Sequence, residues 1–169
     1  MKIIKQLTTP IIQTSWLADA LFAFIRFTCG MLLSIDFGAS KFGVPWTDAD
    51  RNLNLFEVSA WFPEDVASYG GIFAVAPVFF AWMGAFSEAV GGVLLAFGLQ
   101  TRISSFLIMC TMLVAIFCQH WGEGSWQLLP AMGFLWMASY NLYFGSGRFG
   151  LDYLISPPFK TTQSLKSNQ

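Results

Sequence analysis

Two charged residues lie deep inside apolar stretches of this chain, and they are the first candidates for chemistry. Arg26 belongs to the stretch 18–40, and Glu88 belongs to the longest apolar stretch, 71–99. An ionisable group near the centre of a bilayer costs about 2.5–3.5 kcal/mol to insert, so such groups commonly pair or take part in function. The two residues therefore mark where polar chemistry is expected inside a membrane.

The depths of these two charges predict that they pair. Arg26 lies about three residues before the middle of its stretch and Glu88 about three residues after the middle of its own. In two antiparallel helices both charges therefore lie about 4–5 Å to the same side of the midplane. We therefore expect an ion pair between Arg26 and Glu88. It would either fix the packing of two helices or form a polar pocket that holds a quinone head group, a proton or a small polar ligand.

Small residues on the same helical faces favour close packing around the two charges. Gly91 and Gly92 share a face with Glu88, and Gly30 follows Arg26 by one helical turn. Faces of small residues let helix backbones approach closely in membranes. We expect these two faces to pack against each other.

A second group of polar residues is predicted where the first and third apolar stretches end, and it consists of Asp36, Lys41, His120 and Glu123. His120 is the only histidine. It is either a proton-handling group or a solvated residue at the membrane surface. The spacing of these residues matches no metal-binding motif, so no metal site is predicted.

The composition indicates an integral membrane protein. The chain of 169 residues is 55% apolar and 11% charged, whereas soluble domains carry about 25% charged residues. Its formal net charge of -1 argues against a nucleic-acid-binding surface. The lipid bilayer is therefore the first partner that the sequence implies.

Four membrane spans are predicted, at 18–40, 71–99, 103–119 and 125–144. Each is close to the length of about 20 residues that crosses a bilayer. Short turns between the last three spans predict an all-α, antiparallel four-helix bundle. The long loop 41–69 mixes apolar and polar residues at 53–62, which indicates an interfacial helix.

The positions of lysine and arginine predict the orientation. Most of them fall on one side of the predicted spans, and only Lys41 and Arg51 fall on the other. By the positive-inside rule, both termini are cytoplasmic and the long loop is outside. The expected location of this multi-pass protein is the plasma (bacterial inner) membrane. The transmembrane domain is expected over 1–155, and the polar segment 156–169 is expected to be a disordered cytoplasmic tail.

Three sequence blocks, taken together, carry a family resemblance. The first, 26–41, has an arginine, a glycine four residues later and a closing G-x-x-K. The second, 88–102, reads E-x-x-G-G-x-L-L-x-x-G-x-x-T-R, and the third, 145–152, is a glycine-rich turn that ends in Leu-Asp. In order and spacing these blocks resemble the DoxX family. The motif residues are Gly30, Gly91, Gly92, Arg102, Arg148 and Asp152.

The resemblance implies a four-helix membrane domain and a link to respiratory or redox chemistry. Members of the family include a small subunit of thiosulfate:quinone oxidoreductase and membrane partners of thiol-redox enzymes. The expected function is thus a quinone-linked or redox-associated membrane subunit, with quinone as the candidate cofactor and a redox enzyme or another membrane subunit as partner. Its candidate pocket residues are Arg26, Glu88, Asp36, Lys41 and His120, and no catalytic residue is assigned.

Two other functions fit the same residues. The protein would be a non-catalytic anchor or assembly partner if the ion pair only holds helices together. It would be a small-solute or proton carrier if the polar residues form a path across the membrane.

Overall fold

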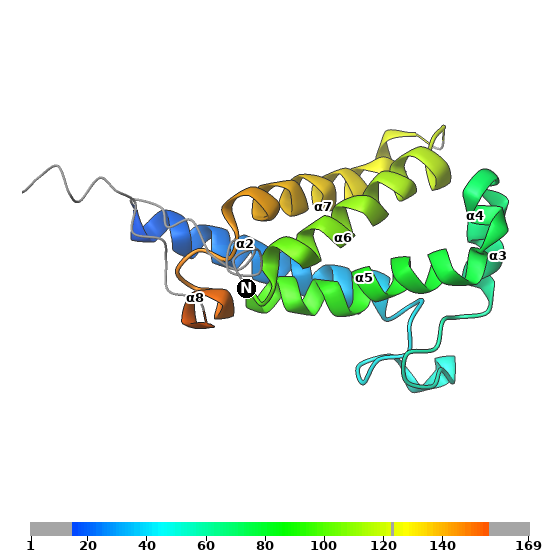
Figure 1. Ribbon diagram of the computed structural model, residues 1–169, viewed down its shortest axis with the longest axis horizontal. Coiled ribbons are helices and arrows are strands. Elements are labelled where there is room, and N and C mark those ends of the chain that lie inside the picture. The colour runs from blue at the N-terminus through cyan, green and yellow to red at the C-terminus, as the bar shows by residue number, and fades with distance from the viewer. Residues whose placement is uncertain (1–14, 123, 156–169) are drawn as a thin grey trace, which may run out of the picture.

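The computed structural model describes residues 15–122 and 124–155, and in this part of the chain the regular structure is helical (Figure 1). The predicted all-α class is confirmed. The long elements are α2 (Trp16–Leu32), which continues as the π-helical turn η1 (Leu33–Gly38), α5 (Pro77–Phe97), α6 (Thr101–Val114), which continues as the π-helical turn η3 (Ala115–Gln119), and α7 (Ser125–Phe144). The short elements are η2 (Ala49–Arg51), α3 (Trp61–Ser68), α4 (Gly71–Val75) and α8 (Leu151–Ile155). The predicted tail 156–169 lies outside the described residues.

Three of the described helices are long and apolar enough to cross a membrane: Trp16–Gly38, Pro77–Phe97 and Thr101–Gln119. They overlap the first three predicted spans. The fourth predicted span, 125–144, is helix α7, which is not among the three. It has Pro130 in its interior.

Pro77 divides the second predicted span into two helices. Helix α4 ends at Val75, and α5 begins at Pro77. Between them Ala76 has φ −141° and ψ 61°, outside the helical region. Proline restricts the residue before it and lacks the N–H that a continuous helix needs. The span predicted over 71–99 is therefore not one helix but a short one followed by a long one.

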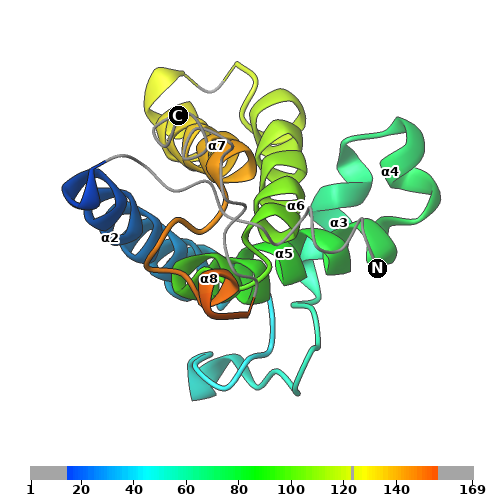
Figure 2. The same cartoon turned by 60° about the vertical axis from the view of Figure 1, so that its left-hand side comes forward.

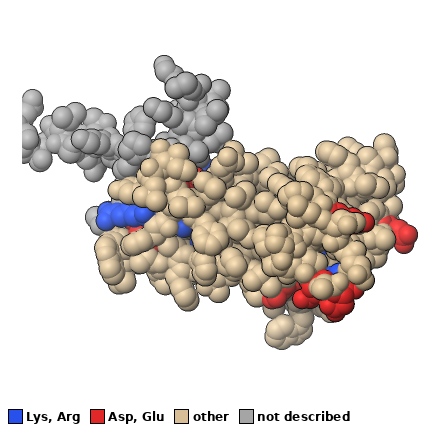
Figure 3. All heavy atoms as spheres, turned by 90° about the horizontal axis from the view of Figure 1, so that it is seen from below, with Lys and Arg blue, Asp and Glu red and all other residues tan. Residues whose placement is uncertain are grey.

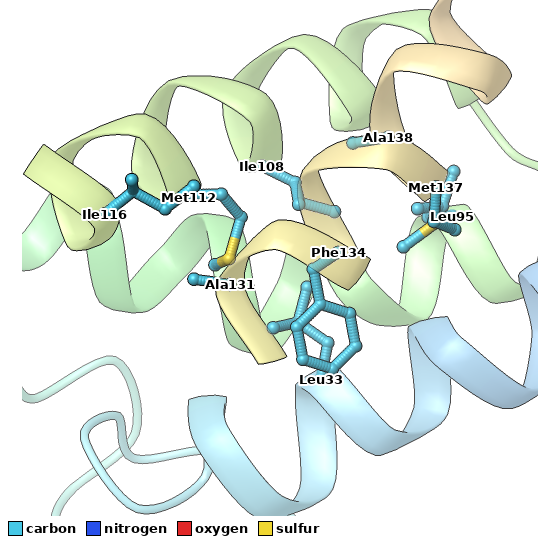
Figure 4. Close-up of a cluster of buried hydrophobic side chains, with 9 residues drawn as sticks. All are labelled: Leu33, Leu95, Ile108, Met112, Ile116, Ala131, Phe134, Met137 and Ala138. Carbon is cyan, nitrogen blue, oxygen red and sulfur yellow. The ribbon is translucent and has the colours of Figure 1, made fainter. Parts of the chain in front are cut away.

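The long helices pack along the chain order (Figure 1). Helix α2 with η1 contacts α5, α5 contacts α6, α6 contacts α7, and α2 also touches α7. Figure 2 shows these four helices grouped together, with α3 and α4 outside the group, beside α5 and α6. Apolar side chains from all four meet in one buried cluster (Figure 4), which contains Leu33, Leu95, Ile108, Met112, Ile116, Ala131, Phe134, Met137 and Ala138.

The long loop is folded differently from the prediction. Residues 53–60 are not helical, and the helix of this region begins at Trp61. Asn52 and Phe56 have positive φ angles of 50° and 64°, which a right-handed helix does not allow. Phe42 and Val58 instead form an isolated antiparallel bridge at the base of the loop. The interfacial helix predicted over 53–62 is therefore wrong in its position.

Candidate ligand pocket

The predicted ion pair between Arg26 and Glu88 is not formed. Close contact between Gly30 and Gly92 sets the register of α2 against α5, because a Cβ on Gly30 would lie 2.6 Å from the Gly92 carbonyl oxygen. In this register the Arg26 guanidinium lies beside Gly98, where a Cβ would be 2.8 Å from it. Glu88 is about ten residues, or about 15 Å of helix, away from that position. The predicted small-residue faces do meet, but they hold the two charges at different depths.

Glu88 pairs instead with Lys41. The Lys41 Nζ donates to the Glu88 Oε2 at 2.7 Å, and the side chains are only 13% and 4% exposed. The Lys41 ammonium also lies 5.0 Å from the centre of the Phe62 ring. A charge inside a membrane helix is costly alone, so Lys41 supplies the partner that Glu88 requires.

The π-helical turn η1 at the end of α2 places Lys41, which follows it, beside Glu88. Within it the Ala39 N–H donates to the Ser34 carbonyl at 2.8 Å, a bond that spans five residues. The Ser34 hydroxyl donates to the Ala89 carbonyl at 2.6 Å, which ties the turn to α5 one residue beyond Glu88. π-helical turns are frequent at functional sites.

A cavity of about 410 Å³ adjoins the Lys41–Glu88 pair. It lies between α5 and α6, with walls from α3, α4 and η3. Most of its lining is aromatic or aliphatic, including Phe62, Phe73 and Phe80. Such a cavity, apolar with a few polar groups that converge on it, is typical of small-molecule sites.

Hydroxyl groups provide further polar contacts at the cavity. The Ser87 and Thr111 side-chain oxygens are 2.5 Å apart, so one hydroxyl donates to the other across the α5–α6 contact. The Tyr69 hydroxyl donates to the Asp65 carboxylate at 2.7 Å. Burial, and then the hydrogen bond to Asp65, raises the pKa of Tyr69 well above its usual value. Tyr69 is therefore a neutral phenol at physiological pH.

The cavity reaches the surface between α5 and α6. Phe79 of α5 and Phe106 of α6 line it and are 59% and 51% exposed. Cys110 also lines it and is exposed. Exposed aromatic side chains on membrane helices face lipid, so this opening connects the polar pair to the hydrocarbon region.

Of the three described members of the second predicted polar group, Asp36, Lys41 and His120, only Lys41 lines the cavity. Asp36 is exposed on η1, and His120 is half-buried after η3. Glu123 lies outside the described residues. Among residues 15–122 and 124–155, no three histidine, cysteine or acidic side chains are grouped as metal ligands.

Arg26 lies near the middle of α2 and binds the turn that follows α7. Its guanidinium donates to the carbonyl oxygens of Ser146 and Phe149, the latter at 3.3 Å. Nearby, the Arg148 Nε lies 3.0 Å from the Asp19 Oδ2. Arg26 therefore anchors the turn after α7, and it does not line the cavity that contains Glu88.

Asp152 holds the same turn against α6. Its carboxylate accepts hydrogen bonds from the backbone N–H groups of Gln100 and Thr101, at 2.7 and 2.9 Å, and from the Thr101 hydroxyl at 2.8 Å. An acidic group at the N-terminus of a helix satisfies its first N–H groups and its dipole. Asp152 thus caps α6 from a distant part of the chain. Arg102, the other motif residue here, donates to the Tyr143 carbonyl at 3.3 Å.

Sequence reasoning missed the hydroxyl side of the pocket. Ser87 directly precedes Glu88, and Thr111 is one of the few polar residues within the third apolar stretch. Tyr69 closes the long loop. The sequence feature that could have identified these pocket residues is the presence of hydroxyl side chains in apolar stretches, where hydrogen bonds between helices are expected.

Comparison with known proteins gives one match. The family model described as DoxX matches residues 51–121, which contain α3, α4, α5 and the walls that α6 and η3 give the cavity. No curated protein and no solved structure matches the chain. The matched segment includes Glu88, although Lys41 and the third block lie outside it. This match bears out the resemblance drawn from the sequence blocks: residues 51–121 match the DoxX family model, and the described part of the chain has three helices long and apolar enough to cross a membrane.

Proposed function

We propose that this protein binds the head group of a lipid-soluble quinone in the cavity beside Lys41 and Glu88, as a redox-associated membrane subunit. The observation that carries the proposal is a buried ion pair at the wall of an otherwise apolar cavity that opens between α5 and α6. Polar residues within membrane helices commonly mark ligand or proton sites.

The donors of the cavity suit a quinone. A quinone presents two carbonyl acceptors on a flat ring, with an apolar tail. The Lys41 ammonium has three N–H donors, and its hydrogen bond to Glu88 uses one of them. Ser87 and Thr111 would provide a second donor if one of these hydroxyls turned from its helix carbonyl, of Gly84 or Leu107, toward the ligand. Phe62 and Phe80 supply aromatic surfaces on which a flat ring stacks.

The opening of the cavity suits the tail of such a ligand. Phe79 and Phe106 are exposed where the cavity reaches the surface. An apolar tail that leaves between them stays in the hydrocarbon of the bilayer and needs no polar contact. A small water-soluble ligand would gain nothing from this exit.

We place the protein in the bacterial inner membrane as an antiparallel bundle in which α7 is the fourth span. The close packing of α7 on α6 supports this arrangement. Figure 3 shows basic side chains near the end where α2 and α8 lie and acidic side chains at the opposite end. By the positive-inside rule the basic end is cytoplasmic and the loop 41–69 is outside.

A quinone-binding subunit requires a donor or acceptor of electrons. We therefore propose a separate redox protein as its partner, which the family resemblance also implies. The cavity lies toward the end of α5 that carries the acidic loop, so the partner would exchange electrons at the outer side.

Cys110 offers a direct test of quinone binding. In purified protein with Cys29→Ser and Cys118→Ser, we expect a short-chain ubiquinone analogue to slow the reaction of Cys110 with a maleimide, because Cys110 lines the cavity. The matched control retains Cys118 alone, which is exposed but does not line the cavity, and its labelling rate should not change. Equal labelling of Cys110 with and without saturating quinone would contradict the proposal.

Thr111→Val provides a second measurement. This substitution keeps the shape of the side chain but removes the hydroxyl that faces Ser87. We expect it to weaken quinone binding by about fivefold to tenfold, the value of one hydrogen bond. Ser139→Ala, on α7 and outside the cavity, should leave the affinity unchanged.

A further inference from the structure

A second cavity, of about 410 Å³, lies at the other end of the molecule between α2, the end of α5 and α8. Figures 1 and 2 both show α8 beside the end of α5. Arg26 and Arg148 line this groove, and no acidic side chain of the described residues does. The rest of its lining is apolar or backbone, with Phe27 and Phe97 on its two long helices.

Arg26 contributes a buried positive charge. The residue is 3% exposed, and its Nε has no hydrogen-bond partner in the described part of the chain. The other guanidinium nitrogens donate to neutral carbonyl oxygens, of Ser146 and Phe149. Asp152 lies near enough to attract Arg26, but its carboxylate oxygens accept hydrogen bonds from α6. The groove therefore has a positive potential at this wall.

Arg148 contributes a charge at the surface. Its side chain is 37% exposed, and its Nε lies 3.0 Å from the Asp19 carboxylate. Asp19 lines a different, smaller cavity, on the side of α2 toward α7. Arg148 therefore contacts Asp19 on one side and lines the groove on the other.

The apolar walls distinguish this groove from a simple anion site. Phe27, Phe97 and Leu154 line it and remain substantially exposed. A small soluble anion would leave the apolar walls without a ligand, and a neutral lipid would offer the buried Arg26 Nε no charged acceptor. An amphipathic anion satisfies both.

We propose that this groove binds an anionic phospholipid, with its phosphate at Arg148 and Arg26 and an acyl chain along Phe27 and Phe97. Basic pockets between membrane helices on the cytoplasmic side bind anionic head groups, and the cytoplasmic leaflet is rich in them. The site is separate from the quinone cavity, which Arg26 and Arg148 do not line. Failure of either proposal therefore leaves the other untouched.

Native mass spectrometry of the purified full-length protein tests the proposal. With phosphatidylglycerol and phosphatidylcholine of identical acyl chains in competition, we expect the wild type to retain phosphatidylglycerol preferentially. Arg148→Gln should lower this preference about fivefold, the value of one basic residue near a membrane surface. Arg102→Gln removes an arginine that does not line the groove and should retain it. Equal losses in both variants would indicate general electrostatic attraction and overturn the site.

Two further variants separate lipid binding from structural damage. Asp19→Asn breaks the contact with Arg148 but keeps the arginine, so phosphatidylglycerol binding should persist. Ala23→Leu keeps both arginines but fills the groove that Ala23 lines, so lipid binding should fall. If Ala23→Leu binds lipid as the wild type does, the proposal is wrong, whatever the folding of Arg148→Gln. Displacement of the lipid by millimolar inorganic phosphate alone would also refute the role of the acyl chain.

Discussion

Gly30 and Gly92 touch through their backbones. A Cβ on Gly30 would lie 2.6 Å from the Gly92 carbonyl oxygen, and a Cβ on Gly92 would lie 2.7 Å from the Gly30 carbonyl oxygen. Neither position has room for a side chain, because backbone atoms cannot move aside as a flexible side chain can. This contact fixes how far α2 slides along α5, and so it determines that Glu88 meets Lys41 rather than Arg26.

Gly30→Ala should therefore destabilise the protein. We expect a loss of about 1–3 kcal/mol, as for other overpacked sites, measured by unfolding in detergent. Gly133→Ala is the matched control, because no atom outside its own helix lies within 4 Å of the added Cβ. Alanine favours a helix interior over glycine by about 1 kcal/mol, so the control should be neutral or stabilising. A similar loss in both variants would contradict a specific backbone contact.

Lys41 and Glu88 should depend on each other. Removal of one partner of a buried pair costs about 3–5 kcal/mol, whereas replacement of both by apolar residues is often neutral. We expect Glu88→Leu to destabilise the protein and Lys41→Met with Glu88→Leu to recover most of the loss. Unfolding free energies of the single and double variants give the coupling directly.

The same cycle with Arg26→Met and Glu88→Leu is the control for that pair. Arg26 and Glu88 do not touch, so their effects on the unfolding free energy should add within about 0.5 kcal/mol.

The stable Lys41→Met, Glu88→Leu double variant also tests quinone binding. Quinone should no longer protect Cys110 in this variant, because the Lys41 donor is gone. A double variant with full stability and full protection would show that the pair only supports packing.

Asp152→Ala should loosen the start of α6. The carboxylate caps Gln100 and Thr101, and loss of an N-cap typically costs about 0.5–2 kcal/mol. Hydrogen exchange at these two amides should accelerate more than exchange in the middle of α6. Asp48→Ala is a suitable comparison, because Asp48 precedes η2 without a side-chain capping bond. Unchanged exchange at Gln100 and Thr101 would refute the cap.

The proposed orientation predicts opposite labelling at two introduced cysteines. In a variant without native cysteines, Asp50→Cys in the long loop should react with a membrane-impermeant maleimide in intact cells. Ser164→Cys should react only after the membrane is opened. Labelling of Ser164→Cys from outside would overturn the cytoplasmic placement of the C-terminus.

Hydropathy located the helices well, because the length and apolar content of a span are properties of a single segment. Helix α7 begins and ends at the predicted residues, Ser125 and Phe144. The register between two helices is not a property of a single segment, since it depends on which small residues of the two helices meet. Depth counted from the middle of each stretch paired Glu88 with Arg26 wrongly, because the contact between Gly30 and Gly92 sets the two helices in a different register.

The pocket could be predicted only in part for the same reason. Glu88 and Lys41 were both identified as candidates, but in different clusters, because a π-helical turn and a loop bridge bring Lys41 to α5. Thr111 reaches Ser87 through the packing of α5 on α6. Pairings of this kind arise from tertiary contacts that periodicity in one segment does not encode.

The bridge at the base of the long loop has a consequence for protein engineering. Phe42 pairs with Val58, and the Ser59 N–H donates to the Lys41 carbonyl at 2.9 Å, so the loop is closed next to the cavity. Residues around Asp50 are exposed beyond this closure. An epitope or a fluorescent domain inserted there would be separated from the cavity by the bridge between Phe42 and Val58. Lengthening an exposed loop adds little to the entropic cost of folding. This exposed turn is therefore a natural attachment point for reporters that leave the cavity intact.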